Sequence, residues 1–349
     1  MKVCDCCFND EEIKRYIVST STEKGICDYC SSESSLIDYR DLDEFFSKFF
    51  SIFKHDEAGG RPIVDVIQDD WNLFSSKAIC VKIFSEFEVI LAITLELGLL
   101  DSSVAVDPNL KVSYIDDIQE SVDFWDKLKE ELKWKKRFLT NTDELIDLSW
   151  DTSFQVYSLL DSGTLLYRSR INQDGQVTPF GCTEMGAPSL KSISAGRANP
   201  QGIPYLYLSK TKETTLYETR ATYLDTITIG TFQIPDQTIL KLVDFTSKES
   251  SFNNIDNIIS FAIGRLLRDV ISQDLSKPMR RYDSELEYIP TQFICEFIRV
   301  ITGADGIQFN SSLDQDGVNV VLFNPKDINC IGVELHQVEK IAIKSVVII

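Results

Sequence analysis

Four cysteines near the beginning of the sequence have the spacing of a metal site. Cys4 and Cys7 form one Cys-x-x-Cys pair, and Cys27 and Cys30 form a second pair after 19 intervening residues. Two thiolate pairs at this spacing are typical of tetrahedral zinc sites. Because four protein ligands leave no open coordination position, we predict that residues 1–32 form a zinc-ribbon-like segment whose metal is structural.

The cysteines leave two alternatives open. A pair of disulfides would also explain the clustering, although a cytoplasmic location disfavours it. Cys6 lies inside the first pair and could replace Cys7 as a ligand. The remaining cysteines are scattered and are expected to behave as small apolar side chains; they are Cys80, Cys182, Cys295 and Cys330.

A second group of polar residues lies in the C-terminal half, beside strand-forming or turn residues. Its three segments are Tyr167–Arg170, Gly196–Glu218 and Gly306–Ser312. In the middle segment, Arg197 is followed ten residues later by Tyr207 and eleven residues after that by Glu218. These residue types can bind an anion, stack on a flat ring and stabilise a developing positive charge.

The segments resemble the RES domain, a family of NAD-consuming toxins whose fold is similar to ADP-ribosyltransferases of the diphtheria-toxin type. The resemblance covers about residues 159–325 and is carried by GRAN, LYLS, TQFICEFIR and GADGIQFNSS. Arg197, Tyr207, Glu218 and one of Ser311 or Ser312 match the family signature in order and approximate spacing. The N-terminal third similarly resembles the zinc ribbon and HEPN-like helical domain that accompany some RES domains.

The resemblance implies that NAD is bound and that its bond to nicotinamide breaks through an oxocarbenium-like transition state. Arg197 and Arg168 are then the candidates to bind the diphosphate, with Arg170 beside them. Tyr207 would stack on the nicotinamide. Glu218 would hold the ribose hydroxyls and stabilise the transition state.

The resemblance gives the signature serine, Ser311 or Ser312, a hydrogen bond to a phosphate oxygen of the substrate or of an inorganic phosphate that acts as nucleophile. Glu213 and Glu184 are alternatives for the acidic role. Each residue also has an ordinary structural explanation when it is taken singly, such as a salt-bridged arginine, a strand tyrosine or a turn serine. The ordered combination is what favours a site.

Composition limits the classes of protein that the chain can belong to. The sequence has 349 residues, of which 43% are hydrophobic, and a formal net charge of −19. This charge repels polyanions, so nucleic acid and anionic membranes are disfavoured as partners. The longest apolar runs are too short to span a bilayer. We expect a folded cytoplasmic protein, and the sequence is compatible with an oligomer.

The periodicity of apolar residues predicts an α+β fold. Apolar stripes indicate helices over about 42–53, 84–100 and 115–138, so residues 33–150 are predicted to form a mostly helical domain after a Ser31–Ser35 linker. The resemblance implies that this domain is HEPN-like. Short β-like runs follow, interrupted by helices over 258–271 and 291–301, so residues 151–349 are predicted to form an α+β domain. The resemblance implies that it is ADP-ribosyltransferase-like, with a mixed β-sheet.

Several other chemistries lack their motifs. The two histidines, His55 and His336, lie in different predicted domains without a nucleophile motif, which argues against a histidine-based triad and against RNA cleavage. The sequence has neither a P-loop nor a strand-linked GxGxxG motif.

We therefore expect a toxin-like enzyme that cleaves the nicotinamide N-glycosidic bond of NAD by hydrolysis or phosphorolysis, with an antitoxin protein as the partner that the family implies. Such an enzyme would act in toxin–antitoxin systems or in abortive defence. Two alternatives remain: an ADP-ribosyltransferase that modifies a macromolecule, and a non-catalytic zinc-ribbon interaction protein.

Overall fold

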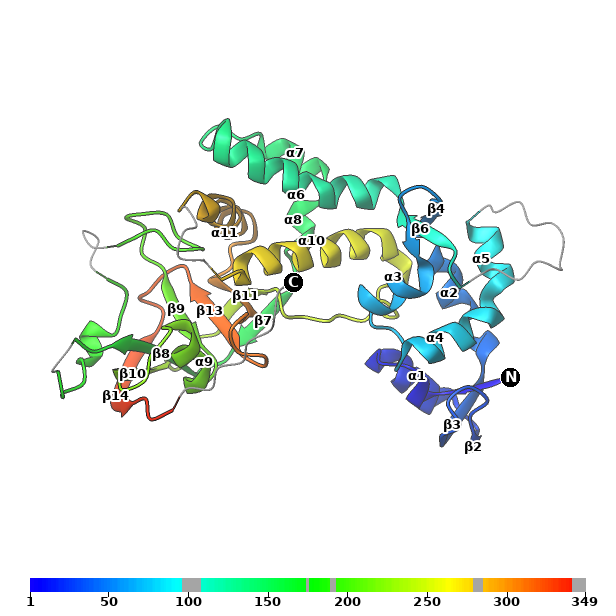
Figure 1. Cartoon of the computed structure of the whole chain (residues 1–349), viewed down its shortest axis with the longest axis horizontal. Coiled ribbons are helices and arrows are strands. Elements are labelled where there is room, and N and C mark those ends of the chain that lie inside the picture. The colour runs from blue at the N-terminus through cyan, green and yellow to red at the C-terminus, as the bar shows by residue number, and fades with distance from the viewer. Residues whose placement is uncertain (96–107, 174–175, 189–192, 279–284, 341–349) are drawn as a thin grey trace, which may run out of the picture. The chain divides into compact units, whose positions relative to one another are not determined.

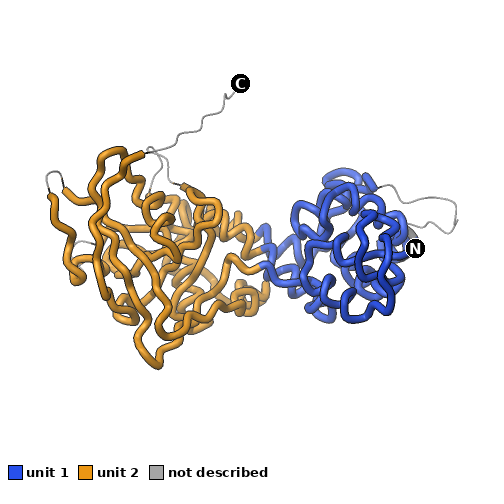
Figure 2. Tube along the Cα trace, turned by 90° about the horizontal axis from the view of Figure 1, so that it is seen from below, with its two compact units in different colours: residues 1–123, 248–266 blue, residues 124–247, 267–349 orange. Residues whose placement is uncertain are grey.

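The computed structural model describes residues 1–95, 108–173, 176–188, 193–278 and 285–340. Contacts divide the chain into two compact units (Figure 2). Unit 1 contains Met1–Asp123 and Lys248–Leu266, and unit 2 contains Phe124–Ser247 and Leu267–Ile349. The domain boundaries that the sequence suggests, after residue 32 and after residue 150, stay predictions.

Unit 1 begins with a three-stranded antiparallel sheet in the order β1-β3-β2. Its elements are β1 (Lys2–Cys4), η1 (Asp5–Cys7), α1 (Glu11–Thr20), β2 (Glu23–Ile26) and β3 (Glu33–Asp38). Asp10 caps α1, because its carboxylate accepts the backbone N–H groups of Glu12 and Ile13. The expected linker Ser31–Ser35 is wrong in part, since its last residues belong to β3, the central strand of this sheet.

The rest of unit 1 combines helices with a second small sheet, in the order β4-β6-β5. Its elements are η2 (Tyr39–Leu42), α2 (Asp43–Phe50), β4 (Phe53–His55), β5 (Arg61–Pro62), α3 (Ile63–Asp69), α4 (Lys77–Phe84), η3 (Ser85–Phe87), α5 (Glu88–Thr94), β6 (Lys111–Tyr114) and η5 (Ile255–Asn257). The phenylalanine stripe of α2 is buried, as its periodicity predicted. The single helix expected over 84–100 is wrong over the described part, where α4 ends at Phe84 and the short η3 and α5 follow; residues 96–100 lie outside the described residues.

Unit 2 is built on an eight-stranded mixed sheet in the order β14-β10-β8-β9-β13-β12-β11-β7 (Figure 1). The strands are β7 (Tyr157–Leu160), β8 (Leu165–Ile171), β9 (Leu206–Ser209), β10 (Thr226–Gln233), β11 (Leu240–Asp244), β12 (Gly306–Asn310), β13 (Val318–Leu322) and β14 (Asn329–Gln337). The β11–β12 pair is parallel and the other pairs are antiparallel.

Helices pack on one face of this sheet and a smaller apolar cluster lies on the other. The packed helices are α7 (Thr142–Asp147), α8 (Trp150–Ser153), α11 (Ile289–Thr302) and the later parts of α6 (Asp116–Trp134) and α10 (Ile258–Ser276), whose first residues belong to unit 1. The remaining elements are η4 (Cys182–Glu184), α9 (Lys212–Glu218) and η6 (Glu285–Tyr288). The predicted α+β class is confirmed. The helices predicted over 115–138, 258–271 and 291–301 are also confirmed, as α6, α10 and α11. In the part of the chain that the structure describes, no helix has the length and apolar character that a bilayer crossing requires.

We predict that Gly306→Ala destabilises unit 2 by about 1–3 kcal/mol, a typical cost of overpacking. A Cβ at this position would lie 2.2 Å from the Val321 carbonyl oxygen on the neighbouring strand, and backbone atoms cannot easily move away. Urea unfolding measures the change. The matched control is Gly332→Ala in β14, where a Cβ meets no atom within 4 Å. Equal stability of the two variants would show that close strand approach at Gly306 is unimportant.

Candidate active site

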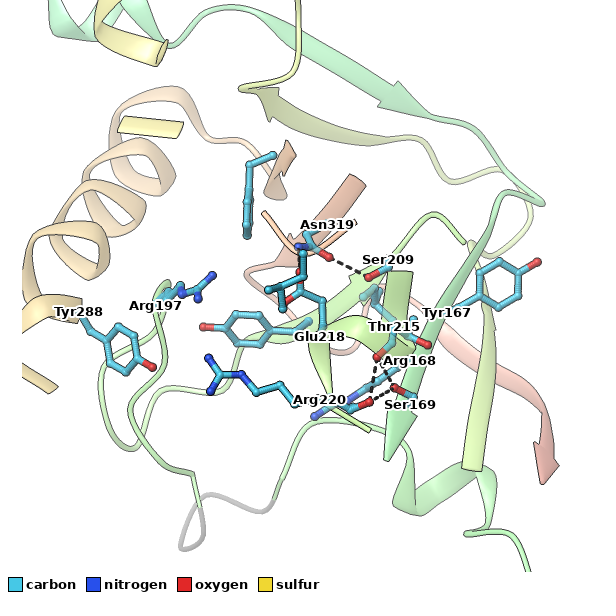
Figure 3. Close-up of a pocket in the computed structure, with 15 residues that line it drawn as sticks. Tyr167, Arg168, Ser169, Arg197, Ser209, Thr215, Glu218, Arg220, Tyr288 and Asn319 are labelled. Carbon is cyan, nitrogen blue, oxygen red and sulfur yellow. Dashed lines mark hydrogen bonds between the residues drawn. The ribbon is translucent and has the colours of Figure 1, made fainter. Parts of the chain in front are cut away.

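A pocket of about 500 Å³ lies in unit 2, which is within the usual size of a small-molecule site. Arg197, Tyr207 and Glu218 all line this pocket, together with Arg168. The three residues that follow one another in the predicted signature therefore lie together in one pocket. In Figure 3, Arg197 and Tyr288 lie on one side of Glu218, and Ser209 and Thr215 lie on the other.

The pocket forms where one face of the sheet changes from apolar to polar side chains. Alternate residues of a strand share a face, so Val321 and Asn319 of β13 point the same way. Val321 belongs to the apolar core, whereas Asn319 lines the pocket. Ser209 of β9 pairs in register with Asn319, and Tyr167 of β8 pairs with Ser209. Three neighbouring strands thus bring polar side chains to one place.

The loop that carries Arg197 is held by the side chains around it. The Tyr207 hydroxyl accepts the Ala198 N–H at 3.0 Å and donates to Asn199 Oδ1 at 2.7 Å. Gly196 allows this approach, because a Cβ there would lie 2.6 Å from the Tyr207 hydroxyl oxygen. The GRxN motif is therefore a turn built around Tyr207, and burial raises the pKa of that phenol.

The Arg197 guanidinium lies at the end of a helix. Its Nη1 donates to the carbonyl oxygens of Leu275 at 3.1 Å and Ser276 at 3.3 Å, which are the last residues of α10. A helix C-terminus carries partial negative charge and so stabilises a cation. Burial lowers the pKa of Arg197, whereas the charge of Glu218 raises it.

Arg168 and Arg170 share one backbone acceptor. Arg168 Nη1 donates to the Gly186 carbonyl at 3.2 Å, and Arg170 Nη2 donates to the same oxygen at 2.8 Å. Burial, followed by the charge of Arg170, lowers the pKa of Arg168 to about 10, so the group remains protonated at neutral pH. Among the residues that the structure describes, neither Arg168 nor Arg197 forms an ion pair with a carboxylate. Two half-buried cations thus face the pocket, and their hydrogen-bond partners among the described residues are carbonyl groups.

The Glu218 carboxylate is held at one oxygen. Ser311 Oγ and Asn319 Nδ2 both donate to Glu218 Oε1 at 2.7 Å. Ser209 Oγ in turn donates to Asn319 Oδ1 at 2.8 Å (Figure 3). Two side chains, from β13 and from the segment after β12, therefore contact the carboxylate directly, and a third, from β9, supports it through Asn319.

The predicted binding residues are not all part of the pocket wall. Ser311 is buried beside Glu218 and Ser312 is exposed, and neither of them lines the pocket. Arg170 also does not line it, although it shares the Gly186 carbonyl with Arg168. The alternative acids Glu213 and Glu184 are exposed and lie outside the lining.

Several lining residues were not predicted from the sequence, among them Asn319, Arg220 and Tyr288. Asn319 had a signal, since it is a polar residue inside the apolar run VNVVLF. Arg220 follows α9 with a φ of 52°, a left-handed conformation that is unfavourable for a side chain of this kind. Such backbone strain is common at functional sites, but the sequence does not reveal it.

The four predicted zinc ligands come together in unit 1. The Sγ atoms of Cys4, Cys7, Cys27 and Cys30 all lie within 4.8 Å of one another, an arrangement that could hold a metal ion. The Sγ–Sγ distances are 3.9 Å for Cys4–Cys7, 3.4 Å for Cys4–Cys30 and 3.5 Å for Cys7–Cys27. Tetrahedral zinc with Zn–S bonds of about 2.3 Å requires about 3.8 Å between sulfur atoms, so the thiol set fits this ion. Cys6 is exposed and is not one of the four.

We predict that Tyr207→Phe destabilises unit 2 by about 1–3 kcal/mol, because it leaves Asn199 Oδ1 without its donor. Thermal unfolding measures the loss. The matched control is Tyr217→Phe on α9, whose side chain is 55% exposed and should lose almost nothing. A fully stable Tyr207→Phe would mean that the hydroxyl does not hold the Arg197 loop.

Comparison with known proteins identifies the C-terminal part of the chain. Residues 165–336 match the family model of the RES domain. No curated protein matches the chain. The crystal structure of the M. tuberculosis MbcT–MbcA toxin–antitoxin complex is similar at 13% identity over 51% of this chain and 86% of that chain, with a TM-score of 0.27, which is too low to support a structural argument. The resemblance predicted from the sequence is therefore confirmed as a RES domain at residues 165–336.

Proposed function

We propose that unit 2 cleaves the nicotinamide N-glycosidic bond of NAD. The observation that carries the proposal is the meeting of Arg168, Arg197 and Glu218 in one pocket of a RES domain. The electron pair of the broken bond leaves with neutral nicotinamide. The oxygen of water or phosphate then bonds to the ribose carbon and releases its proton.

The arginines suit the diphosphate of NAD. A half-buried cation whose partners are carbonyl groups has lost part of its hydration without gaining a counter-charge, which costs free energy. An anion that enters the pocket supplies this counter-charge. Arg168 and Arg197 approach from β8 and from the loop before β9, so they can contact different phosphate oxygens.

Glu218 suits the reacting ribose. Its carboxylate can accept hydrogen bonds from ribose hydroxyls and lies where positive charge would develop as nicotinamide departs. The aromatic lining residues Tyr207 and Tyr288 offer flat surfaces for the nicotinamide or the adenine.

NAD loss would make this activity toxic to the cell that contains it, so we propose a toxin-like role in the cytoplasm. A neutralising antitoxin protein would then be the expected partner. Co-expression of such a protein would restore growth without altering the pocket residues.

We predict that the purified protein releases nicotinamide from NAD and that Glu218→Gln lowers the rate by about 100-fold, because charge stabilisation is lost. Liquid chromatography measures nicotinamide, and mass spectrometry distinguishes ADP-ribose, its phosphate and a modified macromolecule. Glu213→Gln, on the exposed side of the same helix, should retain the wild-type rate. No release by the wild type, or equal rates for wild type and Glu218→Gln, would disprove the proposed function.

We also propose that the four-cysteine cluster of unit 1 binds a structural zinc ion. The wild type should contain about one zinc per chain, and Cys7→Ser should lose nearly all of it, because a tetrahedral site needs its fourth thiolate. Metal analysis by mass spectrometry measures this ratio. Cys6→Ser is the matched control and should keep its zinc. The reverse pattern would make Cys6 the ligand, and a metal-free wild type would contradict the site.

A further inference from the structure

The hydrogen bonds of Glu218 are unequally divided between its two carboxylate oxygens. Both described donors, Ser311 Oγ and Asn319 Nδ2, end on Oε1. Among the residues that the structure describes, no hydrogen bond ends on Oε2. One oxygen is therefore committed to the protein, while the other is available to a ligand in the pocket.

The direction of the Ser311 hydrogen bond follows from its other contacts. The hydroxyl oxygen accepts the backbone N–H groups of Leu313 at 3.1 Å and Asp314 at 3.3 Å. A hydroxyl has two acceptor lone pairs and a single proton. Both lone pairs are occupied, so the proton is directed toward Glu218.

The direction of the Asn319 amide is fixed in the same way. Ser209 Oγ donates to Asn319 Oδ1, which leaves the Nδ2 group to face Glu218. Asn319 is 8% exposed and Ser209 is 3% exposed, so water has little access to compete for these bonds. Ser209 on β9 thus sets the orientation of the Asn319 amide on the adjacent strand β13.

We propose that Asn319 is a positioning residue, which together with Ser311 fixes the orientation of the Glu218 carboxylate so that its Oε2 receives a ribose hydroxyl. This inference rests on the proposed function and deepens it. A carboxylate held in this way can accept hydrogen bonds at its other oxygen and stabilise positive charge.

The other charged side chains of the pocket are all cationic. The other charged groups that line the pocket are guanidinium groups, from β8, from the loop before β9 and from the residue two positions after Glu218; they are Arg168, Arg197 and Arg220. Tyr167, Tyr207 and Tyr288 are the titratable neutral groups of the lining. No second carboxylate lines the pocket among the described residues.

The test measures nicotinamide release and NAD affinity for Asn319→Ala in two backgrounds, wild type and Glu218→Gln. In the wild-type background we expect kcat to fall by about 10- to 100-fold, with the dissociation constant of NAD changed by less than about threefold. In the Glu218→Gln background we expect almost no further loss, because Asn319 acts through Glu218. Asn319→Asp should lose more than Asn319→Ala, since it places a negative charge against Oε1.

The matched control is Asn172→Ala. Asn172 is also a buried asparagine of unit 2, and its Oδ1 likewise accepts a hydroxyl, from Thr228 at 2.7 Å, but it lies outside the pocket. The Asn172→Ala variant should be less stable than the wild type but keep the wild-type kcat. If Asn319→Ala does not fold, Ser209→Ala is tested in its place. This variant keeps the Asn319 amide and removes only the hydrogen bond that orients it.

Two results would overturn the inference while leaving the proposed function intact. One is a wild-type kcat in Asn319→Ala, and the other is an equal loss in both backgrounds, which would indicate a general structural role. A wild type without any nicotinamide release would instead reject the proposed function, and the inference with it.

Discussion

Half-buried guanidinium groups with carbonyl partners determine the character of the pocket. A carbonyl oxygen carries partial charge, so it solvates a cation without neutralising it. A carboxylate partner would have cancelled the charge and made the site indifferent to anions. Arg197 at the end of α10 and Arg168 at the Gly186 carbonyl both follow this pattern. The positions of these carbonyl groups therefore matter to the site as much as the arginines do.

The part of the site that the sequence predicted is the part encoded over short distances. Gly196, Arg197 and Asn199 lie within one turn, and Tyr207 reaches that turn from the next strand. Such a unit has a recognisable pattern because its members contact each other. Glu218 follows on the next helix, so the order of these residues was informative.

The part that was missed depends on strand register and on backbone conformation. Asn319 reaches Glu218 only because β13 pairs with β9 so that Asn319 lies opposite Ser209. A shift by one residue would turn it to the other face of the sheet, and no short-range rule fixes that register. The same limit applies to unit 1, where Lys248–Leu266 joins a core formed mainly by the first 123 residues. The CxxC pairs, by contrast, were predictable because each pair is local and two such pairs are typical of metal sites.

The net charge of −19 and the cationic pocket act over different distances. Surface charges are screened within about 8–10 Å at physiological salt, so the overall field mainly slows the approach of an anion. Inside the pocket, Arg168 and Arg197 act at contact distance, where burial strengthens electrostatic interactions. A dinucleotide that enters the pocket, as we propose, meets these local charges. A nucleic acid would extend beyond the pocket and meet the repulsion of the acidic chain along its length. The charge distribution therefore favours a small anion over a large one as ligand.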